Sequence, residues 1–120
     1  MSQAIYHAHL MDHARNPRNK GEVADADVVQ KGDNPSCGDT LTLYLTYEGE
    51  KVKDAGFTGS GCAVSTAAAS LLTDKLKGMT RDEAGKLTDA DMYDMLKVEI
   101  HGSREKCALL ALATLREALR

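Results

Sequence analysis

Three cysteines carry most of the chemistry that this sequence could perform. Cys37 lies in a turn, whereas Cys62 and Cys107 each lie near the start of an expected helix. None stands inside an apolar run, where a structural cysteine would be expected. A helix N-terminus favours a thiolate, and Arg104 and Lys106 add positive charge beside Cys107. These positions indicate metal or sulfur chemistry, although each cysteine taken singly could also be a small buried hydrophobe.

Asp39 is the natural fourth ligand, because it follows Cys37 by two residues. Three thiolates and a carboxylate suit tetrahedral Zn²⁺. The same set could hold an iron–sulfur cluster, whose usual ligands are four thiolates, and a carboxylate should make that cluster easier to release. The separations between the cysteines match no zinc-finger template, in which ligands come in close pairs. From spacing alone, a metal site and a purely structural role remain equally open.

Composition narrows the class of protein. The chain has 120 residues, which predicts a single domain over residues 1–120. Its net charge of −3, one Phe, four Tyr and no Trp argue against nucleic-acid binding. It shows neither the apolar segment of a secretory signal nor a stretch long enough to span a membrane. An odd cysteine count excludes a closed disulfide framework, so we expect a cytoplasmic protein with reduced thiols.

The first half of the chain predicts a helix followed by strands. We expect a helix over 2–14, a strand near 23–30 and a turn over 31–35. Residues 40–47 alternate between Leu or Tyr on one face and Thr or Tyr on the other, which is typical of a half-buried strand. Residues 51–58 return as its antiparallel partner. This hairpin could bring Cys37 near Cys62.

The second half predicts only helices. An Ala-rich helix runs from residue 63 and ends at Gly78, and Thr80 with Glu83 matches the capping box of a short helix. Thr88 begins another helix, with Met92 and Met95 in the core, and Ser103 caps the last one. Strands segregated from helices predict an α+β domain: a three-stranded antiparallel sheet with helices packed mainly on one face.

Other polar and small residues near these elements have weaker functional signals. His9 and His13 stand four apart with Asp12 nearby, a spacing that can bind metal, but a solvated helix face is the favoured interpretation. His101 could approach Cys107, and a loop position is again favoured. The expected motif glycines leave the backbone uncrowded for a cluster or a partner's side chain; they are Gly38, Gly59 and Gly61.

Four segments resemble the motifs of one known family. They are the N-terminal residues 6–21 and the three cysteine motifs Asn-Pro-Ser-Cys-Gly-Asp (34–39), Gly-Ser-Gly-Cys-Ala-Val-Ser (59–65) and Arg-Glu-Lys-Cys-Ala-Leu (104–109). In order and distance they resemble the NifU N-terminal family, which includes IscU and SufU, over nearly the whole chain. The SufE/NifU-like fold of that family is α+β with a three-stranded antiparallel sheet. In this family His13 is expected to have a packing or partner role.

The resemblance implies a scaffold for iron–sulfur cluster assembly. A cysteine desulfurase that uses pyridoxal phosphate supplies persulfide sulfur, and a transient [2Fe–2S] cluster passes to apo iron–sulfur recipient proteins. Cys37, Cys62 and Cys107 are then the thiolate ligands. Asp39 is the carboxylate that ligates the cluster or keeps it labile, and the same four residues hold Zn²⁺ in the cluster-free form. Such a scaffold is not itself an enzyme.

The sequence differs from each branch of this family. Lys106 stands where IscU proteins have a histidine, and Arg104, Lys106 and Cys107 resemble SufU instead. Residues 98–103 replace the Leu-Pro-Pro-Val-Lys segment of IscU, which argues against the dedicated chaperone that reads that segment. The insertion that SufU carries between its second and third cysteines is missing. The chain is therefore SufU-like at its third cysteine motif and IscU-like in length.

Two other functions compete with the scaffold. One is a zinc-dependent sulfurtransferase of the SufU kind, in which Cys37 leaves the metal to accept sulfur as a persulfide. The other is a structural zinc or plain binding module, for which Cys37→Ser would leave desulfurase turnover unaffected. Lys106 favours the sulfurtransferase and the missing insertion opposes it.

Overall fold

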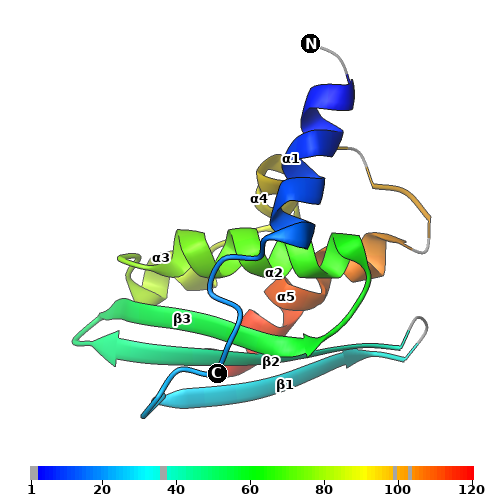
Figure 1. The fold of residues 1–120 in the computed structure, drawn as a ribbon. Helices are drawn as coiled ribbons and strands as arrows, with labels where there is room; N and C mark the ends of the chain where they lie inside the picture. Colours follow the sequence, from blue (N-terminus) through cyan, green and yellow to red (C-terminus); the bar gives the residue numbers. More distant parts are fainter. Residues whose placement is uncertain (1–2, 36–37, 99, 103) are drawn as a thin grey trace.

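The computed structural model describes residues 3–35, 38–98, 100–102 and 104–120. The sheet has three strands, and the helices of this part lie on one side of it (Figure 1), so the predicted α+β fold is confirmed. The elements in chain order are α1 (Gln3–Arg15), β1 (Val28–Asn34), β2 (Asp39–Glu48), β3 (Lys51–Ser60), α2 (Ala63–Leu76), α3 (Arg81–Gly85), α4 (Asp89–Leu96) and α5 (Arg104–Ala118).

The central strand β2 places the leucines against the helices. It pairs antiparallel with β1 on one side and β3 on the other, and Leu41, Leu43 and Leu45 are buried beneath α2 and α5. The predicted alternation is thus confirmed as far as Leu45. The register shifts between Thr46 and Tyr47, where β3 carries one extra residue, Lys53. Tyr47 is half-buried and packs against the core, so it keeps the predicted face.

The boundaries predicted for the first strand and the turn after it were wrong. The strand β1 begins at Val28, not near residue 23, and it continues to Asn34 through the residues expected to form a turn. Each residue from Val28 to Asn34 pairs with one on β2, ending with Asn34 opposite Asp39. Pairing with a neighbouring strand outweighs the local turn preference of Gly, Asp and Asn. The turn that remains brings β1 directly back to Asp39.

Two helices cover the sheet and form the core with it. The helix α2 buries Ala67, Ala68 and Leu72, and α5 buries Leu112 and Leu115, all with none of the side chain exposed. The small side chains of α2 let it lie between α5 and α1. A capping box at Thr80 starts α3 and α4 begins after Thr88, both as predicted, and the structure shows a second capping box at Thr88. No helix in the described segments is long and apolar enough to cross a membrane.

The two histidines of α1 do not form a solvated face, which corrects that prediction. His13 is buried, and its Nδ1 lies 2.8 Å from the Ser70 hydroxyl of α2. His9 is half-buried, with Nε2 3.1 Å from the Met95 carbonyl oxygen of α4. The expected packing role of His13 is confirmed. The helical spacing was a poor guide here, because polar groups on α2 and α4 form hydrogen bonds with these rings and so allow them to be buried.

We expect the protein to lose stability as the pH falls below about 6.5. Burial, with the nearby Arg18 and His9, lowers the pKa of His13. The unfolded chain therefore takes up a proton that the folded protein resists, and the free energy of unfolding decreases. Urea unfolding between about pH 7.5 and pH 5 measures the slope. His13→Gln should flatten it, whereas His7→Gln, at an exposed position of the same helix, should leave it unchanged. An unaltered slope in His13→Gln would contradict this role.

Candidate metal centre

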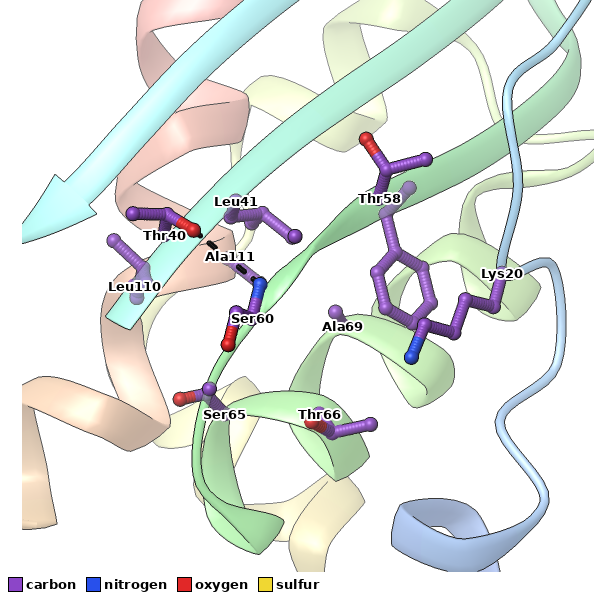
Figure 2. A pocket seen from close by; sticks show the side chains of 13 residues that line it. Lys20, Thr40, Leu41, Thr58, Ser60, Ser65, Thr66, Ala69, Leu110 and Ala111 are labelled. Atoms are coloured by element: carbon purple, nitrogen blue, oxygen red, sulfur yellow. Dashed lines mark hydrogen bonds between the residues drawn. The ribbon is translucent and has the colours of Figure 1, made fainter. Parts of the chain in front are cut away.

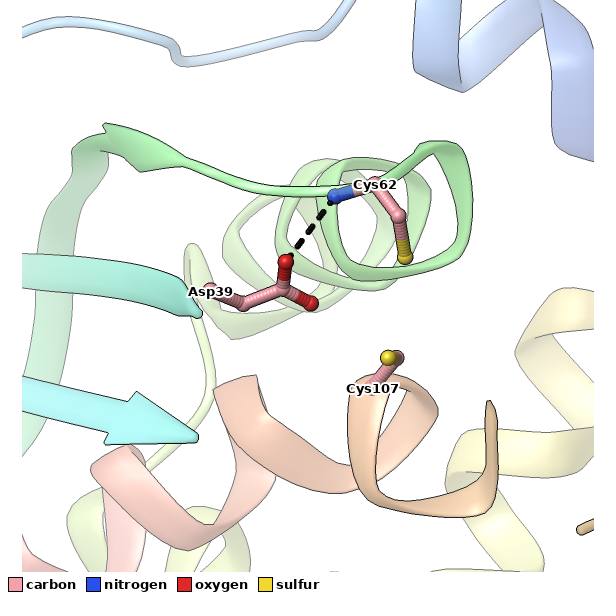
Figure 3. Close-up of side chains that lie close together, drawn as sticks. All are labelled: Asp39, Cys62 and Cys107. Atoms are coloured by element: carbon pink, nitrogen blue, oxygen red, sulfur yellow. Dashed lines mark hydrogen bonds between the residues drawn. The ribbon is translucent and has the colours of Figure 1, made fainter. Parts of the chain in front are cut away.

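Three of the predicted site residues converge at one end of the sheet. One carboxylate oxygen of Asp39 and the sulfur atoms of Cys62 and Cys107 all lie within 4.8 Å of one another. They come from the first residue of β2, the N-cap of α2 and the first turns of α5 (Figure 3). Sequence spacing gave no reason to place Cys107 beside the other two residues. The packing of α5 against α2 brings it there.

Asp39 is held by the beginning of α2. The backbone N–H of Cys62 donates to Asp39 Oδ1 at 3.2 Å, and the Ser65 hydroxyl donates to Asp39 Oδ2 at 2.5 Å. The side chain of Cys62 makes no cap of its own, so a carboxylate from β2 occupies the end of the helix where an anion is stabilised. Asp39 is only 5% exposed, and these two bonds fix the direction of its carboxylate.

The two cysteine residues differ in their exposure to solvent. Cys107 is 4% exposed, whereas Cys62 is half-buried and its Sγ lies 3.6 Å from the Ser65 hydroxyl. The site is therefore closed on the side of α5 and open beside Cys62. Arg104 and Lys106 are exposed on the first turn of α5.

Two of the three motif glycines have a different role from the one expected. A Cβ on Gly59 would lie 2.2 Å from the Thr40 carbonyl oxygen, and one on Gly61 would lie 3.3 Å from Asp39 Cγ. At both positions the chain itself approaches closely, at Thr40 for Gly59 and at Ser65 and Asp39 for Gly61. Gly38 has open space around its Cβ position and a φ of +75°, which agrees with the expectation for that residue.

The remaining predicted residues divide into three groups. Cys37 lies outside the described residues, as does Ser103, so the expected approach of Cys37 to Cys62 stays a prediction. His101 is exposed and is not in the group of three. Met92 is buried and Met95 packs against the core, as predicted.

Ser65 is the residue that the sequence interpretation missed. Its motif was noted, but no role was assigned to the serine. A signal existed: it stands three residues after Cys62, and that spacing places two side chains on the same face of a helix's first turn.

A small pocket adjoins this centre but is not itself a ligand site. Figure 2 shows Thr40, Ser60 and Ser65 at one end of it and Lys20 at the other. Its volume of about 20 Å³ has room for about one water molecule. The open thiol and carboxylate group is therefore the candidate site.

The donor set fits a metal ion of intermediate softness. Two thiols and one carboxylate supply three of the four ligands that Zn²⁺ takes in tetrahedral sites. Iron in a cluster also prefers thiolates, and a single carboxylate is a harder ligand that exchanges more readily. The chemistry of the site is therefore metal or cluster binding with one weak ligand.

Comparison with known proteins places this chain and its fold in one family. The description "NifU-like N terminal domain" matches residues 5–120, and the chain belongs to that family. The iron–sulfur cluster assembly scaffold protein IscU of Thermotoga maritima is 36% identical over 132 residues, which span 97% of this chain and 93% of that protein. The zinc-dependent sulfurtransferase SufU of Bacillus subtilis is 46% identical over 74 residues, or 62% of this chain and 50% of that protein.

Solved structures agree with this assignment. A SufU protein from Fervidobacterium islandicum AW-1 superposes with a TM-score of 0.85 at 31% identity, and the match covers 100% of both chains. The N-terminal part of a NifU-like protein from Brucella abortus gives a TM-score of 0.78 at 25% identity, over 97% of this chain and 92% of that one.

Proposed function

We propose that this protein is a scaffold on which a labile [2Fe–2S] cluster is assembled before transfer to apo-proteins. The observation that supports it most is the convergence of Asp39, Cys62 and Cys107 from three separate elements. Relatives named as cluster assembly scaffolds match nearly the full chain. Cys37 is the proposed fourth ligand; it lies outside the described residues, and its motif supports its inclusion.

Sulfur arrives in this proposal by exchange between thiols. A cysteine desulfurase that uses pyridoxal phosphate carries a persulfide, and a scaffold thiolate attacks its terminal sulfur. The donor S–S bond breaks, the donor cysteine leaves as a thiolate, and no electrons are gained or lost. Reducing two such sulfurs to sulfide takes four electrons. Two ferrous ions supply two of them, and a thiol or ferredoxin-class reductant supplies the rest.

Release depends on the unequal ligands. Cys62 is half-buried, so a recipient's thiolate can approach the cluster from that side, whereas Cys107 is enclosed by the core. The carboxylate of Asp39 is the ligand that exchanges first, because iron in a cluster binds thiolate more firmly.

Anaerobic reconstitution tests the scaffold proposal. Protein supplied with ferrous iron, cysteine, a thiol reductant and a cysteine desulfurase should develop visible charge-transfer absorption and contain acid-labile sulfide. The colour should pass to an apo-ferredoxin on mixing. Protein that keeps one zinc ion and never develops this absorption is not a scaffold.

Asp39→Ala should make a reconstituted cluster several-fold longer-lived. The reason is that the exchangeable carboxylate ligand, where a competing thiolate enters, is then absent. Decay of the visible absorption under a chelator measures the lifetime. Asp54→Ala, at a half-buried acidic position on β3 that pairs with Lys77 instead of the site residues, is the control and should decay like the wild type. Faster loss from Asp39→Ala would refute this role.

A zinc-dependent sulfurtransferase is the second candidate. The matched segment of the Bacillus subtilis SufU and the exposed Lys106 beside Cys107 support it. In that function Zn²⁺ stays bound while Cys37 accepts the persulfide sulfur. Stimulated desulfurase turnover with zinc retained, and no cluster formed, would favour this function over the scaffold.

A further inference from the structure

We propose that Ser65 is a positioning residue, whose hydroxyl holds the Asp39 carboxylate in the direction that metal binding requires. This inference rests on the proposed function, because it takes Asp39 as a ligand. It assigns to Ser65 an action through Asp39 and no direct bond to the metal or cluster.

The geometry of the carboxylate supports this role. Each oxygen of Asp39 accepts one hydrogen bond from the beginning of α2, from the N–H of Cys62 and from the hydroxyl of Ser65. One contact alone would leave the carboxylate free to rotate, whereas two fix its plane. The plane of Asp39 is thereby fixed relative to the helix that carries Cys62.

The hydroxyl of Ser65 has two polar neighbours but only one proton. Asp39 Oδ2 lies at 2.5 Å and Cys62 Sγ at 3.6 Å. The shorter contact takes the proton, because a bond from O–H to a carboxylate is about twice as strong as one between neutral groups. Ser65 is only 9% exposed, so this bond is largely shielded from solvent.

The chain before α2 leaves room for this arrangement. A Cβ on Gly61 would stand 3.0 Å from Ser65 Oγ and 3.3 Å from Asp39 Cγ. The side chains of Ser65 and Asp39 therefore both lie close to the position that a side chain at residue 61 would begin to fill. The serine is not simply capping its own helix, since its hydroxyl donates across to Asp39 of β2.

Zinc affinity tests the role of Ser65. Ser65→Ala removes only the hydroxyl and keeps a strong helix former, so α2 should still fold. Competition with a chromophoric chelator should show Zn²⁺ bound about tenfold more weakly, the loss typical of a lost outer-shell partner. Co²⁺ used as a probe should show altered ligand-field absorption. Ser65→Thr, which keeps the hydroxyl, should stay within about threefold of the wild type.

Two comparisons separate positioning from a general effect on stability. Ser70→Ala removes a buried hydroxyl from the same helix, away from the site, and should leave Zn²⁺ affinity unchanged. In the Asp39→Ala background, Ser65→Ala should change affinity less than twofold, because the group through which it acts is gone.

The outcomes are distinct. If the wild type binds neither Zn²⁺ nor Co²⁺ at this site, the proposed function fails and the inference falls with it. If the wild type binds both ions and Ser65→Ala matches it in affinity and absorption, the role of Ser65 alone is wrong. An equal loss in the Asp39→Ala background would also overturn it.

Discussion

Cys107→Ser is expected to weaken Zn²⁺ binding by at least about a hundredfold, since losing a ligand costs more than the 10–100-fold typical of an outer partner. The thiol of Cys107 is 4% exposed and lies within 4.8 Å of the other two donors. Serine keeps nearly the same volume, so the helix and the core should persist. Its hydroxyl is a far poorer ligand for Zn²⁺ than a thiolate.

Chelator competition measures this affinity, and circular dichroism confirms that the variant is folded. Ala111→Ser is the matched control, because it also adds a buried hydroxyl to α5, one turn beyond Cys107. We expect it to bind Zn²⁺ like the wild type. Binding by Cys107→Ser within about threefold of the wild type would show that this cysteine is only part of the core.

Gly59→Ala is expected to destabilise the protein by about 3 kcal/mol or more. The added Cβ would lie 2.2 Å from the Thr40 carbonyl oxygen, and the φ of Gly59 is +138°, which side chains rarely adopt. The clash is with backbone, so it can be relieved only by separating the ends of β2 and β3. Those ends carry Asp39 and lead into Cys62, so we also expect weaker metal binding.

Gly49→Ala separates the clash from the backbone conformation. Gly49 lies in the turn between β2 and β3 with a φ of +63° and open space around its Cβ position. Its replacement should cost only about 1 kcal/mol, the strain of a left-handed residue. Urea unfolding of both variants gives the comparison. Equal destabilisation would mean that close approach to Thr40 contributes little.

Local signals predicted much of the fold. The alternation through Leu45, the capping box at Thr80 and the helix start at Thr88 depend on neighbours a few residues away, so sequence alone was sufficient. The extent of β1 depends on pairing with β2, which local composition does not encode. Turn-forming residues therefore gave a misleading boundary.

The sequence predicted the residues of the candidate site better than it predicted their arrangement in space. Residue types and motif resemblance pointed to Asp39, Cys62 and Cys107, but only the packing of α5 on α2 brings the third donor to the others. Ser65 was overlooked, and the spacing of His13 wrongly favoured a solvated face, for a related reason. Each makes its hydrogen bond with a residue more than 20 positions away, Asp39 and Ser70 respectively. No periodicity reveals such a partner.

The three donors lie on separate elements, a strand and two helices. This arrangement has a consequence for the stability of the fold. A metal ion bound to all three would act as a removable cross-link between β2, α2 and α5. A ligand that binds only the folded chain raises its free energy of unfolding by RT ln(1 + L/Kd), where L is the free ligand concentration. Binding and release of the metal would then change the stability of the packing of α5. The rate of cleavage by a protease would measure that change.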